Sequence, residues 1–198
     1  QTPDGKTSFG PNQEWYLDER ARIAGCGPTS GALLTAYLAA SNPDRYGALY
    51  QQPTFAYDDF VRHMQRMYRY LRPGAMGLNR LESYREGMEK YAADTKTALT
   101  PLTFPVAGIE YLSRDREASL CTFVRDALCA DQPVAFLALS RGRERALQNW
   151  HWITIISAKI GDQELIATAS DEGISREFDL LNWYRTTRLS GGLIRFSS

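Results

Sequence analysis

The sequence predicts an α+β fold in which N-terminal helices precede a C-terminal antiparallel β-sheet. Apolar residues recur at helical spacing as far as about residue 130. Short apolar runs separated by turn residues follow, and hairpin turns join the later runs. Segregation of helices and strands along a chain is typical of α+β proteins. We therefore expect residues 1–198 to form a single domain, with a mainly helical lobe over about 1–130 and a β-sheet lobe over about 131–198.

Composition narrows the functional classes. The formal net charge is +0, which argues against a nucleic-acid partner. The 3 cysteines include no Cys-x-x-Cys pair and do not suggest a disulfide framework, and with only 2 histidines we expect no metal site. No apolar run approaches the roughly 18 residues that a membrane helix requires, so we expect no membrane segment.

Compartment and oligomeric state do not follow from the sequence. The chain begins at Gln1 rather than Met, so we expect the native N-terminus to be missing. Unpaired cysteines favour a reducing environment, which favours the cytoplasm over secretion.

The helices are expected in the first two thirds of the chain. Residues 1–19 are polar, and we expect them to form an extended arm whose Trp15, Tyr16 and Leu17 pack onto the body. Apolar periodicity then predicts four helices, at about 26–40, 57–71, 79–92 and 116–130.

Three chemically capable side chains on these helices are interpreted as structural. His63 lies beside the apolar stripe of the helix at 57–71, and we expect it to be a surface or partly buried bystander. Cys121 and Cys129 lie about two turns apart on the helix at 116–130, with no base in sequence beside them. We interpret both as small hydrophobic residues.

The strands are expected mainly in the last third. Residues 97–111 mix β-branched residues with two prolines and predict a short strand followed by a loop. Further strands are expected at 133–139, 151–158, 163–169, 174–178 and 192–196, with a short helix at 180–186.

The helix at 26–40 opens with the motif Gly25-Cys26-Gly27-Pro28-Thr29-Ser30. A helix N-terminus carries unpaired N–H groups and about half a positive charge, which favours the thiolate form of a cysteine placed there. The two glycines leave the backbone around the sulfur unhindered. The motif therefore indicates a nucleophilic cysteine, the alternative being a buried cysteine that begins a core helix.

A cysteine nucleophile needs a base, which is usually a histidine oriented by a third polar group. His151 stands where a charged loop meets a strand, so we expect it at the rim of the sheet. Trp150 and Trp152 flank it, and we expect them to line a cleft around the imidazole. The alternative is a histidine at a strand end with no chemical role.

The third polar group is expected on the neighbouring strand. A hairpin centred near residue 161 pairs positions whose numbers sum to about 322, and 151 and 171 satisfy that sum. Asp171 would then lie beside His151 and hold its imidazole in the productive tautomer. Asn182 is a weaker candidate for this role. The structural alternative is that Asp171-Glu172-Gly173 is an ordinary turn with no chemical role.

An oxyanion formed during acyl transfer needs hydrogen-bond donors. The backbone N–H of Cys26 supplies one. A side-chain amide from the segment before the nucleophile is expected to supply the second, and Gln13 and Asn12 are the candidates.

These residues resemble a known family. The motifs are GCGPTS at 25–30, Asn149-Trp150-His151-Trp152 at the start of a strand, and Asp171-Glu172-Gly173 after a hairpin. Together they are similar to the papain-like cysteine peptidases, and among these to the bacterial bacteriocin-processing type and its stand-alone C39-like relatives. The resemblance implies a papain-like fold with Cys26 as nucleophile, His151 as base and Asp171 as orienting acid.

The resemblance is not uniform along the chain. It is compatible with the order of elements from about residue 12 to the end, but residues 43–115 match nothing in the family. The oxyanion glutamine of the family usually lies about six residues before the cysteine, where this chain has Arg20. Gln13 reaches the site only if the intervening loop is longer.

We therefore expect a cysteine-dependent hydrolase, a peptidase that cleaves amide bonds of a peptide or protein substrate, with no metal or organic cofactor. Two alternatives stay open. The same triad could perform acyl transfer or cleave a peptidoglycan amide. The chain could also be a non-catalytic binding module in which Trp150, Trp152 and Trp183 line a groove.

Overall fold

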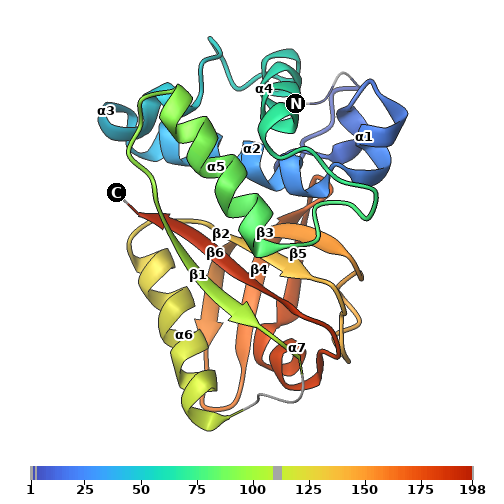
Figure 1. Cartoon of the computed structure of the whole chain (residues 1–198), viewed down its shortest axis with the longest axis vertical. Coiled ribbons are helices and arrows are strands. Elements are labelled where there is room, and N and C mark those ends of the chain that lie inside the picture. Colours follow the sequence, from blue (N-terminus) through green and yellow to red (C-terminus); the bar gives the residue numbers. More distant parts are fainter. Residues whose placement is uncertain (1, 3, 109–112, 198) are drawn as a thin grey trace.

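The computed structural model describes residues 2, 4–108 and 113–197 and confirms the predicted α+β fold. Helices gather at one end of the molecule, and a six-stranded antiparallel sheet occupies the other (Figure 1). The helices at the first end are α1 (Glu19–Ala24), α2 (Cys26–Ser41), α3 (Pro43–Tyr46), α4 (Tyr57–Tyr70) and α5 (Leu81–Asp94). Two 3-10 turns accompany them, η1 (Gln13–Trp15) and η2 (Gly47–Leu49).

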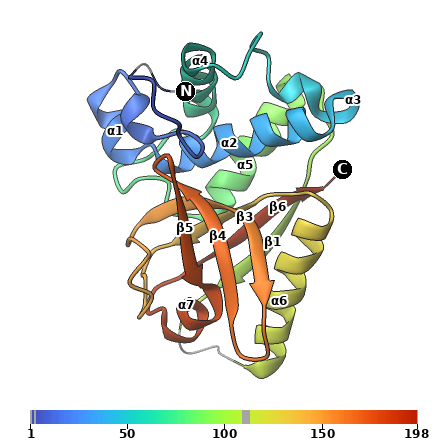
Figure 2. The same cartoon turned by 180° about the vertical axis from the view of Figure 1, so that it is seen from behind.

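The sheet has the strand order β1-β6-β2-β3-β4-β5, and every neighbouring pair is antiparallel. Its strands are β1 (Thr100–Val106), β2 (Val134–Ala138), β3 (His151–Ile160), β4 (Leu165–Asp171), β5 (Ile174–Asp179) and β6 (Gly191–Ser197). The remaining helices, α6 (Arg114–Cys129) and α7 (Leu180–Thr186), lie at the sheet end of the molecule (Figure 2).

The sheet separates two hydrophobic cores, which explains the unbroken apolar character of its central strands. In β2, Ala135 and Leu137 belong to the core shared with α2, whereas Phe136 between them belongs to the core shared with α6. In β3, Trp152 and Ile153 divide in the same way. A strand covered on both faces carries apolar residues at every position rather than at alternate ones.

The expected boundaries of the four long helices hold. Each predicted helix begins and ends within two residues of α2, α4, α5 or α6. No helix within the described residues is both long and apolar enough to cross a membrane.

Two elements cross the expected division of the chain near residue 130. β1 joins the sheet as an edge strand paired with β6, and its prolines, Pro101 and Pro105, are tolerated there because an edge strand needs fewer ladder donors. The loop expected after it reaches residues 109–111, which lie outside the described residues. α6 packs in the core on the sheet face that also carries α7, and not in the core shared by α2, α4 and α5.

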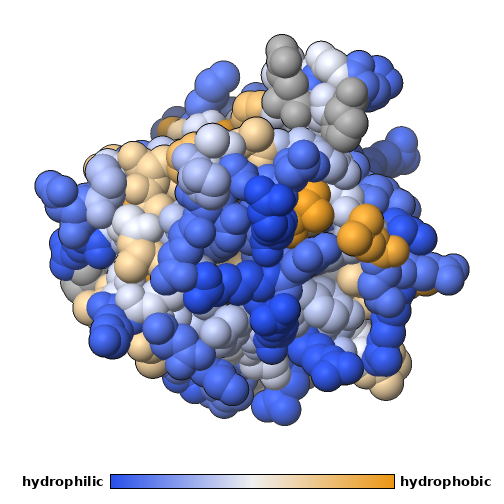
Figure 3. Space-filling model, turned by 90° about the horizontal axis from the view of Figure 1, so that it is seen from above, coloured by the Kyte–Doolittle hydropathy of each residue, from blue (hydrophilic) through white to orange (hydrophobic). Residues whose placement is uncertain are grey.

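The expected N-terminal arm is not extended throughout: it contains the turn η1, and α1 begins at its last residue, Glu19. Asn12 caps η1 and Asp18 caps α1, each through a side-chain oxygen that accepts a backbone N–H. Tyr16 is buried as predicted. Leu17, in contrast, is 81% exposed, so the prediction that it packs onto the body is wrong. It belongs to a set of exposed apolar side chains on the helical half, whose surface is otherwise mostly polar (Figure 3).

His63 is completely buried, which corrects the expectation that it is a surface or partly buried residue. Its Nε2 forms a 2.8 Å hydrogen bond with the hydroxyl of Thr35, and its Nδ1 has no hydrogen-bond partner among the described residues. Burial, followed by the charge of Arg66, lowers the pKa of His63 to about 4. The imidazole is therefore neutral at pH 7 and packs within the core of the helical half.

Acid is expected to destabilise the protein through His63. An unfolded histidine titrates near pH 6.5, so between about pH 6.5 and 4 the unfolded state binds a proton that the folded state does not. The stability that the folded protein gains from the neutral imidazole of His63 is fully present above pH 6.5 and is lost as the pH falls towards 4. We expect His63 to lower the free energy of unfolding by about 3 kcal/mol between pH 7 and pH 4.

Urea unfolding at both pH values measures this effect. His63→Gln keeps a polar atom near Thr35 but does not titrate, so its stability should depend less on pH by that amount. Equal pH dependence of the variant and the wild type would contradict the assignment.

Candidate active site

Cys26 is the first residue of α2, directly after the one-residue break between α1 and α2. Gly25 forms this break and admits no side chain, because a Cβ there would lie 2.2 Å from the carbonyl oxygen of Ala21. A Cβ on Gly27 would lie 2.7 Å from the side chain of Leu78. The two glycines thus allow close packing around the sulfur, and the half-buried thiol of Cys26 lies at the positive end of a 16-residue helix.

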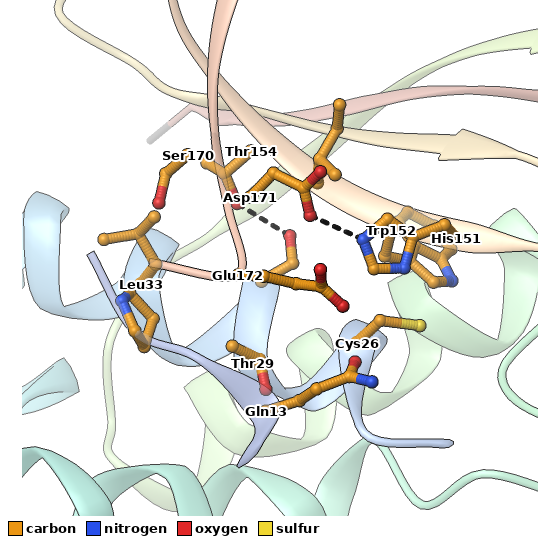
Figure 4. A pocket seen from close by; sticks show the side chains of 13 residues that line it. Gln13, Cys26, Thr29, Leu33, His151, Trp152, Thr154, Ser170, Asp171 and Glu172 are labelled. Carbon is orange, nitrogen blue, oxygen red and sulfur yellow. Dashed lines mark hydrogen bonds and ion pairs between the residues drawn. The ribbon is translucent and has the colours of Figure 1, made fainter. Parts of the chain in front are cut away.

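His151 is the first residue of β3 and is 8% exposed. Its Nε2 donates a 2.6 Å hydrogen bond to Oδ1 of Asp171. The opposite edge of the imidazole ring points towards Cys26 (Figure 4). The structure therefore brings the three predicted residues together, from the start of α2, the start of β3 and the end of β4.

His151 and Asp171 each stabilise the charged form of the other. Burial by itself lowers the pKa of His151, but hydrogen bonds to Asp171 and Cys26 and the charges of both outweigh it and raise the pKa to about 10. Burial likewise raises the pKa of Asp171, but the hydrogen bonds and charges of His151 and Arg176 hold it below the usual range of an aspartate. At neutral pH the pair is an imidazolium beside a carboxylate.

The pairing of β3 with β4 differs from the expected register. The observed partners, Thr154 with Ser170 and Ile160 with Leu165, sum to 324 and 325 rather than 322. A bulge between Ile155 and Ser157 accounts for the change along the hairpin. His151 and Asp171 consequently meet diagonally, which suffices because long side chains reach a diagonal neighbour.

Arg176 is a site residue that the sequence analysis missed. Its Nε donates a 2.5 Å hydrogen bond to Oδ2 of Asp171, and its Nη1 donates to the carbonyl of Ala146 at 3.1 Å. Residues 172–173 form a two-residue turn, so β4 and β5 pair from Asp171 with Ile174 onwards. The turn motif fixes this register, and the register places Arg176 on the same face of the sheet as Asp171.

The two amide candidates for the oxyanion site have different surroundings. Gln13 lines the same pocket as Cys26, and Figure 4 shows its amide beside the cysteine. Its Nε2 donates to the carbonyl of Arg22 at 2.8 Å, which leaves the second N–H of the amide for another acceptor. Asn12 does not line this pocket. Its side-chain oxygen accepts from the backbone N–H of Glu14, and its side-chain nitrogen donates to the carbonyl of Glu172.

The tryptophans do not share one role. Trp152 is 2% exposed, stacks on Tyr84 with ring centroids 4.3 Å apart and donates its N–H to the carbonyl of Leu78. It borders the pocket from within the core. Trp150 is 46% exposed and is not among the residues that line the pocket. Trp183 is completely buried against Phe136, so no groove is lined by all three tryptophans.

The other reactive side chains lie elsewhere. Asn182 donates to Glu144 and does not line the pocket. Cys121, on α6, has its pKa raised by burial and then by Glu117. Within the described residues, no group of three or more His, Cys, Asp or Glu side chains is arranged to hold a metal ion.

A hydrogen bond fixes α2 against the sheet near the site. The hydroxyls of Ser30 and Thr154 lie 2.8 Å apart, four residues after Cys26 and three residues after His151. This contact ties the two segments that carry the nucleophile and the base. The site can therefore support attack by a thiolate on an electrophilic carbon, with an oriented imidazolium at hand.

Comparisons with known proteins add no assignment. No family model matches the chain, and searches of curated proteins and of solved structures return no significant match. The resemblance to papain-like cysteine peptidases therefore depends on the sequence motifs and stays a prediction.

Arg176 is expected to act as a positioning residue. In Arg176→Met, the carboxylate of Asp171 loses the guanidinium that helps to hold its pKa down. We expect the acid limb of the pH profile of Cys26 alkylation by iodoacetamide to move to higher pH by about one unit, because an opposite charge in direct contact lowers the pKa of an aspartate by about one unit or more. The rate is measured by peptide mapping after short pulses between pH 4 and pH 9.

Arg125→Met is the matched control, because Arg125 is exposed on α6 and pairs only with Asp126 among the described residues. A change confined to stability would leave the pH profile of the folded variant unaltered. An Arg176→Met profile that coincides with the wild type would refute the positioning role.

Proposed function

We propose that the protein is a cysteine-dependent hydrolase, a peptidase that cleaves amide bonds through Cys26, His151 and Asp171. The observation that carries the proposal is the buried His151–Asp171 pair, 2.6 Å between Nε2 and Oδ1, turned towards a cysteine at a helix N-terminus. A structural role for the cysteine alone does not require an oriented, charged imidazole beside it. The papain-like interpretation of the fold belongs to the same proposal and is supported by the order of helices before sheet.

The reaction follows from these positions. The thiolate of Cys26 attacks the amide carbon, a sulfur–carbon bond forms, and the oxyanion receives hydrogen bonds from the backbone N–H of Cys26 and from Gln13. His151 gives its proton to the leaving amine as the carbon–nitrogen bond breaks. Water then attacks the thioester and returns a proton to His151, which releases the acid and regenerates the thiolate.

Selective alkylation tests the nucleophile. A free cysteine with a pKa of about 8.5 is less than about 1% thiolate at pH 6. We expect Cys26 to react with iodoacetamide at pH 6 about a hundredfold faster than Cys121, because Cys26 stands at the N-terminus of α2 beside the imidazole of His151, whereas burial and then Glu117 raise the pKa of Cys121. Peptide mapping after short pulses distinguishes the three cysteines.

His151→Ala should abolish the selectivity, whereas Cys121→Ser should leave the rate at Cys26 unchanged. The binding-module alternative predicts that Cys26 labels no faster than the other two cysteines. Incubation of the wild type with a peptide mixture and a primary amine, followed by mass spectrometry, then separates new carboxyl ends from amine adducts. The first outcome supports hydrolysis and the second supports acyl transfer, with Cys26→Ala as the control.

The oxyanion role of Gln13 has its own test. Gln13→Ala should lower the rate of amide cleavage by about a hundredfold, which is the usual effect of removing one oxyanion donor. Alkylation by iodoacetamide passes through no oxyanion, so its rate should change by less than about threefold. Parallel loss of both rates would indicate that Gln13 supports the structure of the loop instead.

A further inference from the structure

Glu172 lines the same pocket as Cys26 and His151. In Figure 4 its carboxylate extends into the space between Asp171 and Gln13, on the side of Cys26 that faces the hairpin tip. Nothing in the proposed reaction uses this side chain, although it lies beside the residues that perform it.

The turn that carries Glu172 is fixed from outside the hairpin. The backbone carbonyl of Glu172 accepts a 2.9 Å hydrogen bond from the side-chain amide of Asn12. The carbonyl of Gly173 accepts one of 2.7 Å from the backbone N–H of Phe9. Glu172 itself has φ 49°, in the left-handed region where asparagine and aspartate are much commoner than glutamate. The backbone thus aims the side chain at the pocket, at a position that a shorter residue would occupy more easily.

The negative charge of Glu172 is not neutralised within the described residues. It forms no salt bridge there, and its only side-chain partner is the neutral amide of Gln148 at 3.2 Å. Asp171, by contrast, is paired with both His151 and Arg176. No lysine or arginine lines the pocket. The pocket therefore offers an uncompensated carboxylate to whatever occupies it.

Aromatic rings continue this surface beyond the hairpin tip. Glu172 also borders a second hollow whose lining includes Trp15 and Tyr57, with ring centroids 4.9 Å apart. Lys6 lies in the same lining, but its charge is paired with Asp4 at 2.8 Å. A carboxylate beside aromatic rings binds a cation in two ways, through charge-assisted hydrogen bonds and through the ring faces.

We propose that Glu172 determines specificity by selecting substrates that carry a lysine or arginine side chain next to the scissile amide. The basic head group binds the carboxylate of Glu172 and the ring faces of Trp15 and Tyr57 beyond it. This assignment rests on the proposed hydrolase function, since it concerns which peptide is presented to Cys26.

A pair of affinity labels tests the assignment. The chloromethyl ketones of Nα-acetyl-lysine and Nα-acetyl-norleucine differ in the terminal ammonium of the lysine side chain. Both alkylate a catalytic thiolate. We expect the lysine label to modify Cys26 about five- to tenfold faster than the norleucine label in the wild type. In Glu172→Gln the ratio of the two rates should fall to about one; because both rates are measured on the same variant, a change common to both labels cancels from the ratio.

Two further variants complete the comparison. Glu172→Asn suits the left-handed turn and removes the charge, so it should lose the preference without loss of folding. Glu177→Gln makes the same charge change at an exposed position of β5 and should retain the preference.

The outcomes separate the two proposals. Equal rates of both labels at Cys26 in the wild type would overturn the specificity assignment and leave the hydrolase proposal standing. A lysine preference that survives both Glu172→Gln and Glu172→Asn would also overturn it. Failure of both labels to modify Cys26 in the wild type would overturn the hydrolase proposal together with this one.

Discussion

The candidate site depends on one buried ion pair, that of His151 with Asp171. Burial disfavours the charged form of each group, so the pair persists only because each charge has partners. The carboxylate is held by His151 and Arg176, and the imidazolium by Asp171 and Cys26. Because these partners come from α2 and three adjacent strands, the charges cannot be arranged before the helical half and the sheet have packed together.

The N-terminal arm is part of the site rather than an appendage. Residues 8–13 lie against the tip of the β4–β5 hairpin, where the hydroxyl of Ser170 donates to the carbonyl of Phe9 at 2.7 Å. The same arm places Gln13 beside Cys26. It therefore connects Gln13, the candidate oxyanion donor, with the hairpin that carries Asp171 and Glu172.

The sequence predicted residues better than it predicted their contacts. Cys26, His151 and Asp171 were identified correctly as neighbours, yet the register that suggested the last pairing was wrong by two to three positions, because the hairpin turns about Asp162 and Gln163 rather than about Gly161 and Asp162. Arg176 was missed because its partner lies across a strand pair, although the Asp-Glu-Gly turn fixes the register that brings it there. His63 was misplaced because its spacing on α4 puts it next to the apolar stripe, and only the packing of α2 on α4 buries that flank.

The sequence by itself determined the local elements: the helix that starts at Cys26, the strand that starts at His151, and the turn after Asp171. Glycine, proline and apolar periodicity set these through interactions within a few residues of the chain. Only the tertiary structure decided which amide faces the thiol, how Asp171 is neutralised, that Trp150 is exposed while Trp183 is buried, and that Glu172 faces the pocket without a cationic partner among the described residues. These features depend on contacts between segments as far apart as Asn12 and Glu172, and packing rather than local preference fixes such contacts.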